Sequence, residues 1–195
     1  MTRPHGARAT QLYRYWGIAL IALLAAALQL LAPDALRYER EAILHGEVWR
    51  LLTGNLLHLG WAHLALNLAG LAIIGIGFPG AEADRPLRLF GYLLLLGLAV
   101  GVGLLCWSPT VAWYVGLSGA LHGLLVLAAA GEWRRSRGFA LIVLAALAAK
   151  LVWEQIAGAG TTEQLIGGSV VVDSHLYGAL AGAVLALIRH LRSRA

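Results

Sequence analysis

The sequence predicts an all-α fold: a polytopic membrane protein whose single domain, residues 1–195, is a bundle of six transmembrane helices with a short fourth helix. Hydrophobic residues make up 59% of the chain and charged residues 13%, whereas about 25% of a soluble domain is charged. The mean hydropathy is +0.73. Several apolar stretches approach the roughly 20 residues that a helix needs to cross the hydrocarbon core. These observations exclude an ordinary soluble domain.

The predicted spans cover residues 15–32, 60–78, 87–107, 117–131, 138–157 and 174–190. The first span is longer than the hydrophobic region of a signal peptide, about 7–15 residues, and it lacks a clear small-x-small cleavage site. We therefore expect it to be retained as a helix.

The connections between the spans predict the orientation in the membrane. One side carries an excess of arginine: Arg3, Arg8, Arg14, Arg85, Arg88, Arg134, Arg135, Arg137, Arg189, Arg192 and Arg194. The other side carries Arg37, Arg40 and Arg50, diluted by Asp34, Glu39, Glu41 and Glu47. The positive-inside rule then places both termini in the cytoplasm. Membrane topology accounts for the basic pI of 9.9, so no nucleic-acid partner is predicted.

The connection at residues 33–60 is long and amphipathic. Trp49 and Arg50, followed by two leucines, favour an element that lies in the membrane interface with the aromatic ring at headgroup level.

Strongly polar side chains interrupt three of the predicted spans. Ser118 stands between glycines at the start of the fourth span, His63 and Asn67 share a helix face on the second, and His58 precedes them. His175 lies in the first turn of the sixth span. Polar groups at membrane depth are costly and by default indicate a functional site. With the predicted orientation they all fall in the outer half of the membrane, and together they are the parts of a serine hydrolase.

The short fourth span predicts a cavity. Ser118 to Gly131 is about 14 residues, or roughly 21 Å of helix, against a core of about 30 Å. Residues 108–115 must then dip into the membrane as non-helical chain, which is tolerated where protein buries it or water lines it. We expect Ser118 at the floor of a water-filled cavity, at a helix N-terminus that favours developing negative charge.

Glycines predict a close approach of the fourth and sixth spans. Gly116, Gly119 and Gly123 recur on one, and Gly178 and Gly182 form a GxxxG face on the other. Small residues let membrane helices pack closely, which would bring Ser118 within reach of His175. Plain helix packing explains the same pattern.

Each residue also has a structural interpretation. Ser118 suits a helix cap, Asn67 an interhelical hydrogen bond, His58 an interfacial position, and Asp173 the N-cap of the sixth span. The single cysteine, Cys106, lies in an apolar run and suits packing. A metal site would take His58, His63, His122 and His175, but it lacks the usual carboxylate and leaves the serine unexplained.

Lys150 and Glu154 form a second group within the fifth span. They are four residues apart and can pair along one helix face. The pair is either a neutralised structural ion pair or a polar wall or gate beside the cavity.

The chain resembles the rhomboid intramembrane serine proteases over nearly its whole length. The matching motifs are Trp49-Arg50, His58-x4-His63-x3-Asn67, Gly116-x-Ser118-Gly119 and His175-x2-Gly178-x3-Gly182. The resemblance implies a rhomboid-like six-helix bundle and a serine–histidine dyad, with Ser118 as nucleophile and His175 as base. It implies an oxyanion hole formed by His63, Asn67 and the Ser118 backbone N–H, and no cofactor or metal.

One residue differs from the typical rhomboid pattern and indicates a subgroup of the family. His122 stands where typical rhomboids have a tyrosine stacked on the catalytic histidine. This variant and the compact six-span size resemble the rhombosortase subgroup, as do the segments Arg37-Tyr38-Glu39-Arg40 and Trp153-Glu154-Gln155. That subgroup implies a bacterial inner-membrane enzyme, with its active site open to the periplasm, that processes transmembrane substrates with C-terminal Gly-Gly sorting tails. Water or an amine would resolve the acyl-enzyme. The alternatives are a general rhomboid protease, a non-catalytic rhomboid-like binder of membrane proteins and a small transporter with a polar cavity.

Overall fold

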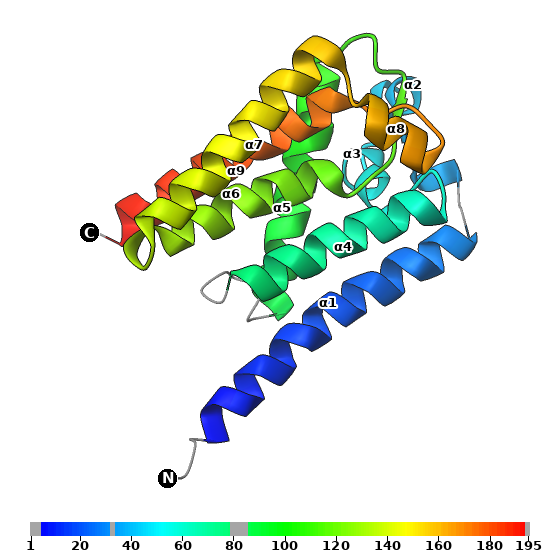
Figure 1. Ribbon diagram of the computed structural model, residues 1–195. Coiled ribbons are helices and arrows are strands. Elements are labelled where there is room, and N and C mark those ends of the chain that lie inside the picture. Colours follow the sequence, from blue (N-terminus) through cyan, green and yellow to red (C-terminus); the bar gives the residue numbers. More distant parts are fainter. Residues whose placement is uncertain (1–4, 32–33, 79–85, 194–195) are drawn as a thin grey trace.

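The computed structural model describes residues 5–31, 34–78 and 86–193, with side chains from residue 16 onward. Its long helices are α1 (His5–Leu31), α4 (Trp61–Gly77), α5 (Pro86–Trp107), α6 (Ser118–Gly131), α7 (Arg137–Ala157) and α9 (Val172–Arg192). They form one bundle in which α1 lies at an edge beside α4 (Figure 1). The start of α1 and the end of α9 lie toward the same end of the bundle (Figure 1).

Each predicted span overlaps one of the long helices, although α1 begins at His5, ten residues before the predicted start of the first span. Within the described part of the chain, α5 and α7 are long and apolar enough to cross a membrane by themselves. The segment Arg50–Leu56 and α4 form a third candidate, a broken span bent by 91°. These apolar helices support a multi-pass membrane protein. The crossing of all six helices stays a prediction.

Short elements gather mostly at the end of the bundle opposite the chain ends (Figure 1). They are η1 (Asp34–Leu36), β1 (Tyr38–Glu39), α2 (Arg40–Leu44), α3 (Arg50–Thr53), η2 (Gly54–Leu56), β2 (Trp113–Tyr114) and α8 (Gly160–Ile166), while η4 (Glu132–Arg134) follows α6. The predicted non-helical segment before Ser118 is confirmed, and it contains β2. This strand pairs antiparallel with β1, with Tyr38 opposite Tyr114.

Arg50 and Trp49 of the predicted interfacial element differ in their exposure, and the location of the element in the interface stays a prediction. Trp49 is half exposed, as an interfacial aromatic would be, but Arg50 is buried. Arg50 Nη1 donates to the backbone carbonyls of Asp34 and Arg37, both at 2.8 Å, and its Nε donates to Glu47 at 2.6 Å. A buried charge requires such partners. Arg50 therefore ties the long connection together.

The core lies between α4, α5 and α6, where Leu71, Leu89, Leu96 and Leu124 are almost fully buried. The predicted glycine contact between α6 and α9 is confirmed. A Cβ atom added at Gly178 would overlap the carbonyl oxygen of Gly119, and one added at Gly182 would overlap that of Gly123. The two backbones therefore touch, and they set the distance between the side chains at the starts of α6 and α9.

The N-cap role predicted for Asp173 is wrong. Helix α9 begins at Val172, its N-cap residue is Val171, and no side chain caps it. Asp173 instead accepts a hydrogen bond of 2.5 Å from Ser108 Oγ, because residue 108, at the end of α5, lies beside the first turn of α9.

Several arginines of the predicted cytoplasmic side lie outside the part of the chain that the structure describes. Arg3, Arg85 and Arg194 lie outside the described residues, as do the side chains of Arg8 and Arg14. The other six arginines of the predicted cytoplasmic side lie at the starts of α5 and α7, in η4 and the residue after it, and at the end of α9.

Candidate active site

Ser118 is the first residue of α6, so its backbone N–H has no partner within the helix. The chain reaches it through Gly116, whose φ of +136° is a conformation that glycine adopts readily and other residues do not. The Gly116 N–H donates to Gly54 O at 3.1 Å, and Tyr114 Oη donates to Gly116 O. The loop thus holds Ser118 at a defined position.

His175 lies in the first turns of α9 and is buried. Its Nε2 is 3.0 Å from Ser118 Oγ, and its Nδ1 is 2.8 Å from Glu154 Oε2. An ionised carboxylate only accepts hydrogen bonds, so Nδ1 carries the proton and Nε2 is left as an acceptor for the Ser118 hydroxyl. A serine and an oriented base in this geometry can form an activated nucleophile.

The contact of Glu154 with His175 was not predicted from the sequence. Glu154 is 5% exposed, comes from α7, and bonds to Lys150 through its other oxygen, Oε1, at 2.6 Å. The predicted pairing of Lys150 with Glu154 is therefore confirmed. The sequence feature that indicated a role for Glu154 was a carboxylate within a span, near the predicted outer side. No sequence feature shows which helix that carboxylate faces.

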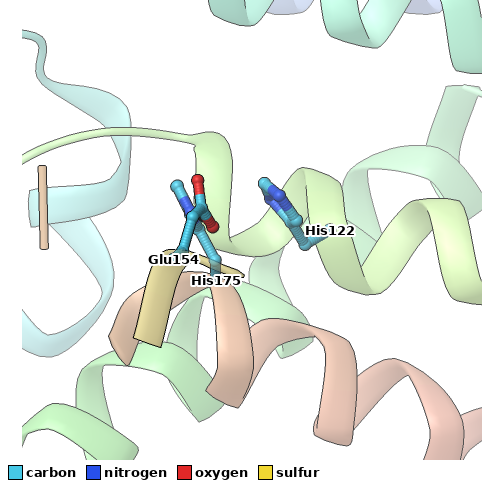
Figure 2. A group of neighbouring side chains, drawn as sticks. All are labelled: His122, Glu154 and His175. Atoms are coloured by element: carbon cyan, nitrogen blue, oxygen red, sulfur yellow. Dashed lines mark hydrogen bonds and ion pairs between the residues drawn. The ribbon is translucent and has the colours of Figure 1, made fainter. Parts of the chain in front are cut away.

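His122 stacks on His175, with ring centroids 4.1 Å apart and planes 15° from parallel. Figure 2 shows the side chains of His122, Glu154 and His175 converging from α6, α7 and α9. His122 Nδ1 donates to Ser118 O at 2.7 Å, so its Nε2 is free to accept from Lys150 Nζ at 3.0 Å. His122 thus connects the start of α6 to the ion pair on α7.

His63 and Asn67 present hydrogen-bond donors beside Ser118. The Leu59 N–H donates to His63 Nδ1 at 3.3 Å, which places the ring proton on Nε2. Asn67 Nδ2 is buried and has no hydrogen-bond partner among the described residues. An unpaired buried donor is costly. Both side chains line the same cavity as Ser118, where they can stabilise a developing negative charge.

The cavity has a volume of about 540 Å³. Its lining includes the polar side chains of Ser118, His175 and Glu154 and apolar side chains such as Leu66 of α4 and Leu165 of α8. An apolar cleft with a few converging polar groups is the usual form of a substrate site.

The remaining residues predicted to support the site contact or position the residues described above. His58 is buried against His63, with ring centroids 5.0 Å apart, and its position at the membrane interface stays a prediction. Gly119 and Gly178 bring α6 and α9 together, and Gly116 leaves room for the His63 ring.

The four-histidine metal site is not the grouping found in the described part of the chain. The group spaced closely enough for a metal ion there is His122, Glu154 and His175. An imidazole binds a metal through a nitrogen lone pair in the plane of its ring. Rings stacked 4.1 Å apart therefore cannot both direct a lone pair at one ion. The arrangement fits acid–base chemistry better.

We expect the Lys150–Glu154 pair to be energetically coupled. Lys150→Ala alone should lower thermal stability more than the Lys150→Ala/Glu154→Ala double replacement, because it leaves one oxygen of a buried carboxylate unpaired. A double-mutant cycle in detergent should give a coupling energy of about 0.5–3 kcal/mol. Additive effects would show that the two side chains do not interact.

Comparison with known proteins identifies the family of the chain. The model of the Rhomboid domain family matches residues 45–192. A relative, the "Rhomboid protease GluP" of Bacillus subtilis (strain 168), is 36% identical over 94 residues, which are 45% of this chain. The match spans 16% of that relative's length. Since the family match covers most of the sequence and includes the cavity and both glycine faces, the chain belongs to the Rhomboid family.

Proposed function

We propose that this protein is an intramembrane serine endopeptidase in which Ser118 is the nucleophile and His175 the general base. The observation that carries the proposal is the hydrogen bond of 3.0 Å between Ser118 Oγ and His175 Nε2, two side chains that line the cavity. The family membership and the protease named among its relatives support the proposal.

The proposed reaction is acyl transfer. His175 Nε2 takes the hydroxyl proton while Ser118 Oγ attacks the substrate carbonyl carbon. His63 Nε2–H, Asn67 Nδ2–H and the Ser118 backbone N–H donate to the oxyanion. The peptide C–N bond then breaks, and the leaving amine takes the proton from His175. Water, deprotonated by His175, then attacks the acyl carbon, the ester bond to Ser118 Oγ breaks, and His175 returns the proton to Ser118 Oγ.

Transmembrane proteins are the proposed substrates, reached from within the bilayer. A helical peptide hides its carbonyls, so the substrate must unwind near the scissile bond, and glycines lower the cost of doing so. The rhombosortase resemblance, carried by His122 and the Trp153-Glu154-Gln155 segment, favours a C-terminal Gly-Gly tail. The same acyl-enzyme can instead transfer its product to an amine.

The proposed location is the bacterial inner membrane. In this arrangement all six long helices cross the membrane, both termini are cytoplasmic, and the cavity opens to the periplasm. The arginine asymmetry of the sequence supports the orientation.

A reporter with a Gly-Gly tail tests the substrate proposal. In proteoliposomes, we expect cleavage at or near the two glycines on the outer side of the reporter's span, located by mass spectrometry of the products. Replacing both glycines with leucine should slow cleavage severely, because the unwound segment becomes harder to form. Equal rates for the two reporters would reject the Gly-Gly specificity and leave a general rhomboid protease.

His122 is expected to support the base without transferring a proton. His122→Ala should lose most of the activity, because the stacked ring and the bridge to Lys150 both disappear. His122→Tyr should retain part of it, since an aromatic ring can still stack on His175. Cleavage rates of both variants on one reporter test this supporting role. Full activity in His122→Ala would reject the supporting role and leave the ring a role in helix packing alone.

A further inference from the structure

We propose that Glu154 is a positioning residue that extends the serine–histidine pair to a Ser118–His175–Glu154 triad. This inference rests on the proposed function, and it assigns to the α7 carboxylate a role in the reaction beyond pairing with Lys150.

The two carboxylate oxygens of Glu154 have separate partners. Oε2 accepts the hydrogen bond from His175 Nδ1 at 2.8 Å, and Oε1 accepts from Lys150 Nζ at 2.6 Å. The side chains of Glu154 and His175 are 6% and 5% exposed, so water does not compete strongly for this contact. Lys150 therefore fixes the carboxylate without occupying the oxygen that faces His175.

The ion pair alone does not explain this arrangement. The Lys150 side chain is 45% exposed and can be solvated without a buried partner. Burying Glu154 has a desolvation cost that an exposed position on α7 would avoid. The buried position does gain the contact with His175, which comes from a different helix.

That contact selects the reactive form of the base. With the proton held on Nδ1, His175 Nε2 presents its lone pair to Ser118 Oγ. The opposite tautomer would carry a proton at Nε2 and could not accept one from the serine. When His175 becomes an imidazolium during attack, the carboxylate stabilises the positive charge, and it stays ionised throughout.

His122 and Lys150 complete the support. His122 stacks on the face of His175, Glu154 bonds to its edge, and Lys150 bonds to both supporting groups. The ring of His175 is thus restrained against both tilting and rotation by side chains from α6 and α7.

Glu154→Gln is the main test, in the full chain reconstituted in proteoliposomes. Glutamine has nearly the same size, but its amide places an NH₂ group at one of the two oxygen positions, so in the same geometry it cannot accept at both Oε1 and Oε2 sites. We expect kcat on a single-span reporter, and the rate at which a fluorophosphonate probe labels Ser118, to fall at least about 100-fold. KM should change less than about threefold, because Glu154 acts through His175.

Glu132→Gln is the matched control. Glu132 is also 5% exposed, and it follows the end of α6 opposite to Ser118. We expect this variant to keep the parental kcat and labelling rate. Loss of activity in the control equal to that in Glu154→Gln would show that any buried amide substitution damages the bundle, and would overturn the proposal.

If Glu154→Gln lowers the melting temperature, Glu154→Asp serves as a second test of the proposal. Aspartate retains the charge but is one methylene shorter, so we expect labelling at least about tenfold faster than with glutamine, at comparable thermal stability. Equal rates for aspartate and glutamine would overturn the proposal.

The Ser118→Ala and His175→Ala variants separate the two claims. If both are inactive while Glu154→Gln keeps kcat within about threefold of the parent, the enzyme uses a dyad and the triad is rejected. If either alanine variant keeps full activity, the proposed function fails and the triad fails with it.

Discussion

Replacing Ser118 or His175 with alanine is expected to abolish cleavage of a transmembrane reporter. The reason is that each replacement removes one side of the hydrogen bond between Ser118 Oγ and His175 Nε2. Removal of the nucleophile or the base of a serine protease lowers kcat by about 10⁶. Mass spectrometry of the reporter should therefore show an intact tail with either variant.

Both variants should still accumulate in the membrane, because each truncated side chain lines the cavity. Comparable amounts of folded protein, measured by thermal unfolding in detergent, are the control. Normal processing by either variant would contradict the assignment of nucleophile and base.

Gly178→Val is expected to produce the second largest effect, and to do so without touching a reacting atom. A Cβ atom at residue 178 would overlap the carbonyl oxygen of Gly119, and backbone atoms cannot move aside as a flexible side chain can. Helices α6 and α9 must separate, which moves His175 away from Ser118. We expect destabilisation of about 1–3 kcal/mol or more and loss of most activity.

Gly138→Val is the matched control for this prediction. Gly138 lies in α7, and a Cβ atom there would meet no atom within 4 Å. Thermal unfolding and fluorophosphonate labelling should both stay near the parental values. Retained activity in Gly178→Val, equal to that of the control, would show that the close approach of α6 and α9 does not set the geometry of the site.

The sequence predicts the components of the site that depend on local pattern. The short apolar run from Ser118 predicts a helix that begins at this residue, and α6 does begin there. The glycines at 119, 123, 178 and 182 predict close packing, and α6 and α9 touch along those residues. The four-residue spacing of Lys150 and Glu154 predicts their pairing, because it is a property of one helix.

Contacts between segments far apart in the chain could not be predicted from the sequence pattern. The rotation of α7 about its axis decides whether Glu154 faces lipid, cavity or His175, and helix packing sets that rotation. The burial of Arg50 depends on backbone carbonyls 13 and 16 residues away. The pairing of β1 with β2 joins two connections that are far apart in the chain, and neither strand is long enough to show a period of two.

The most direct test of the proposed mechanism is to label the membrane-embedded protein with a fluorophosphonate probe and locate the adduct by peptide mass spectrometry. We expect one modified peptide, with the phosphonyl group on Ser118, and no adduct in the His175→Ala variant, because the hydroxyl is unreactive without its base. Labelling of Ser118 that persists at the parental rate in His175→Ala, or an adduct on a different residue, would contradict the proposal that Ser118 and His175 form the catalytic centre.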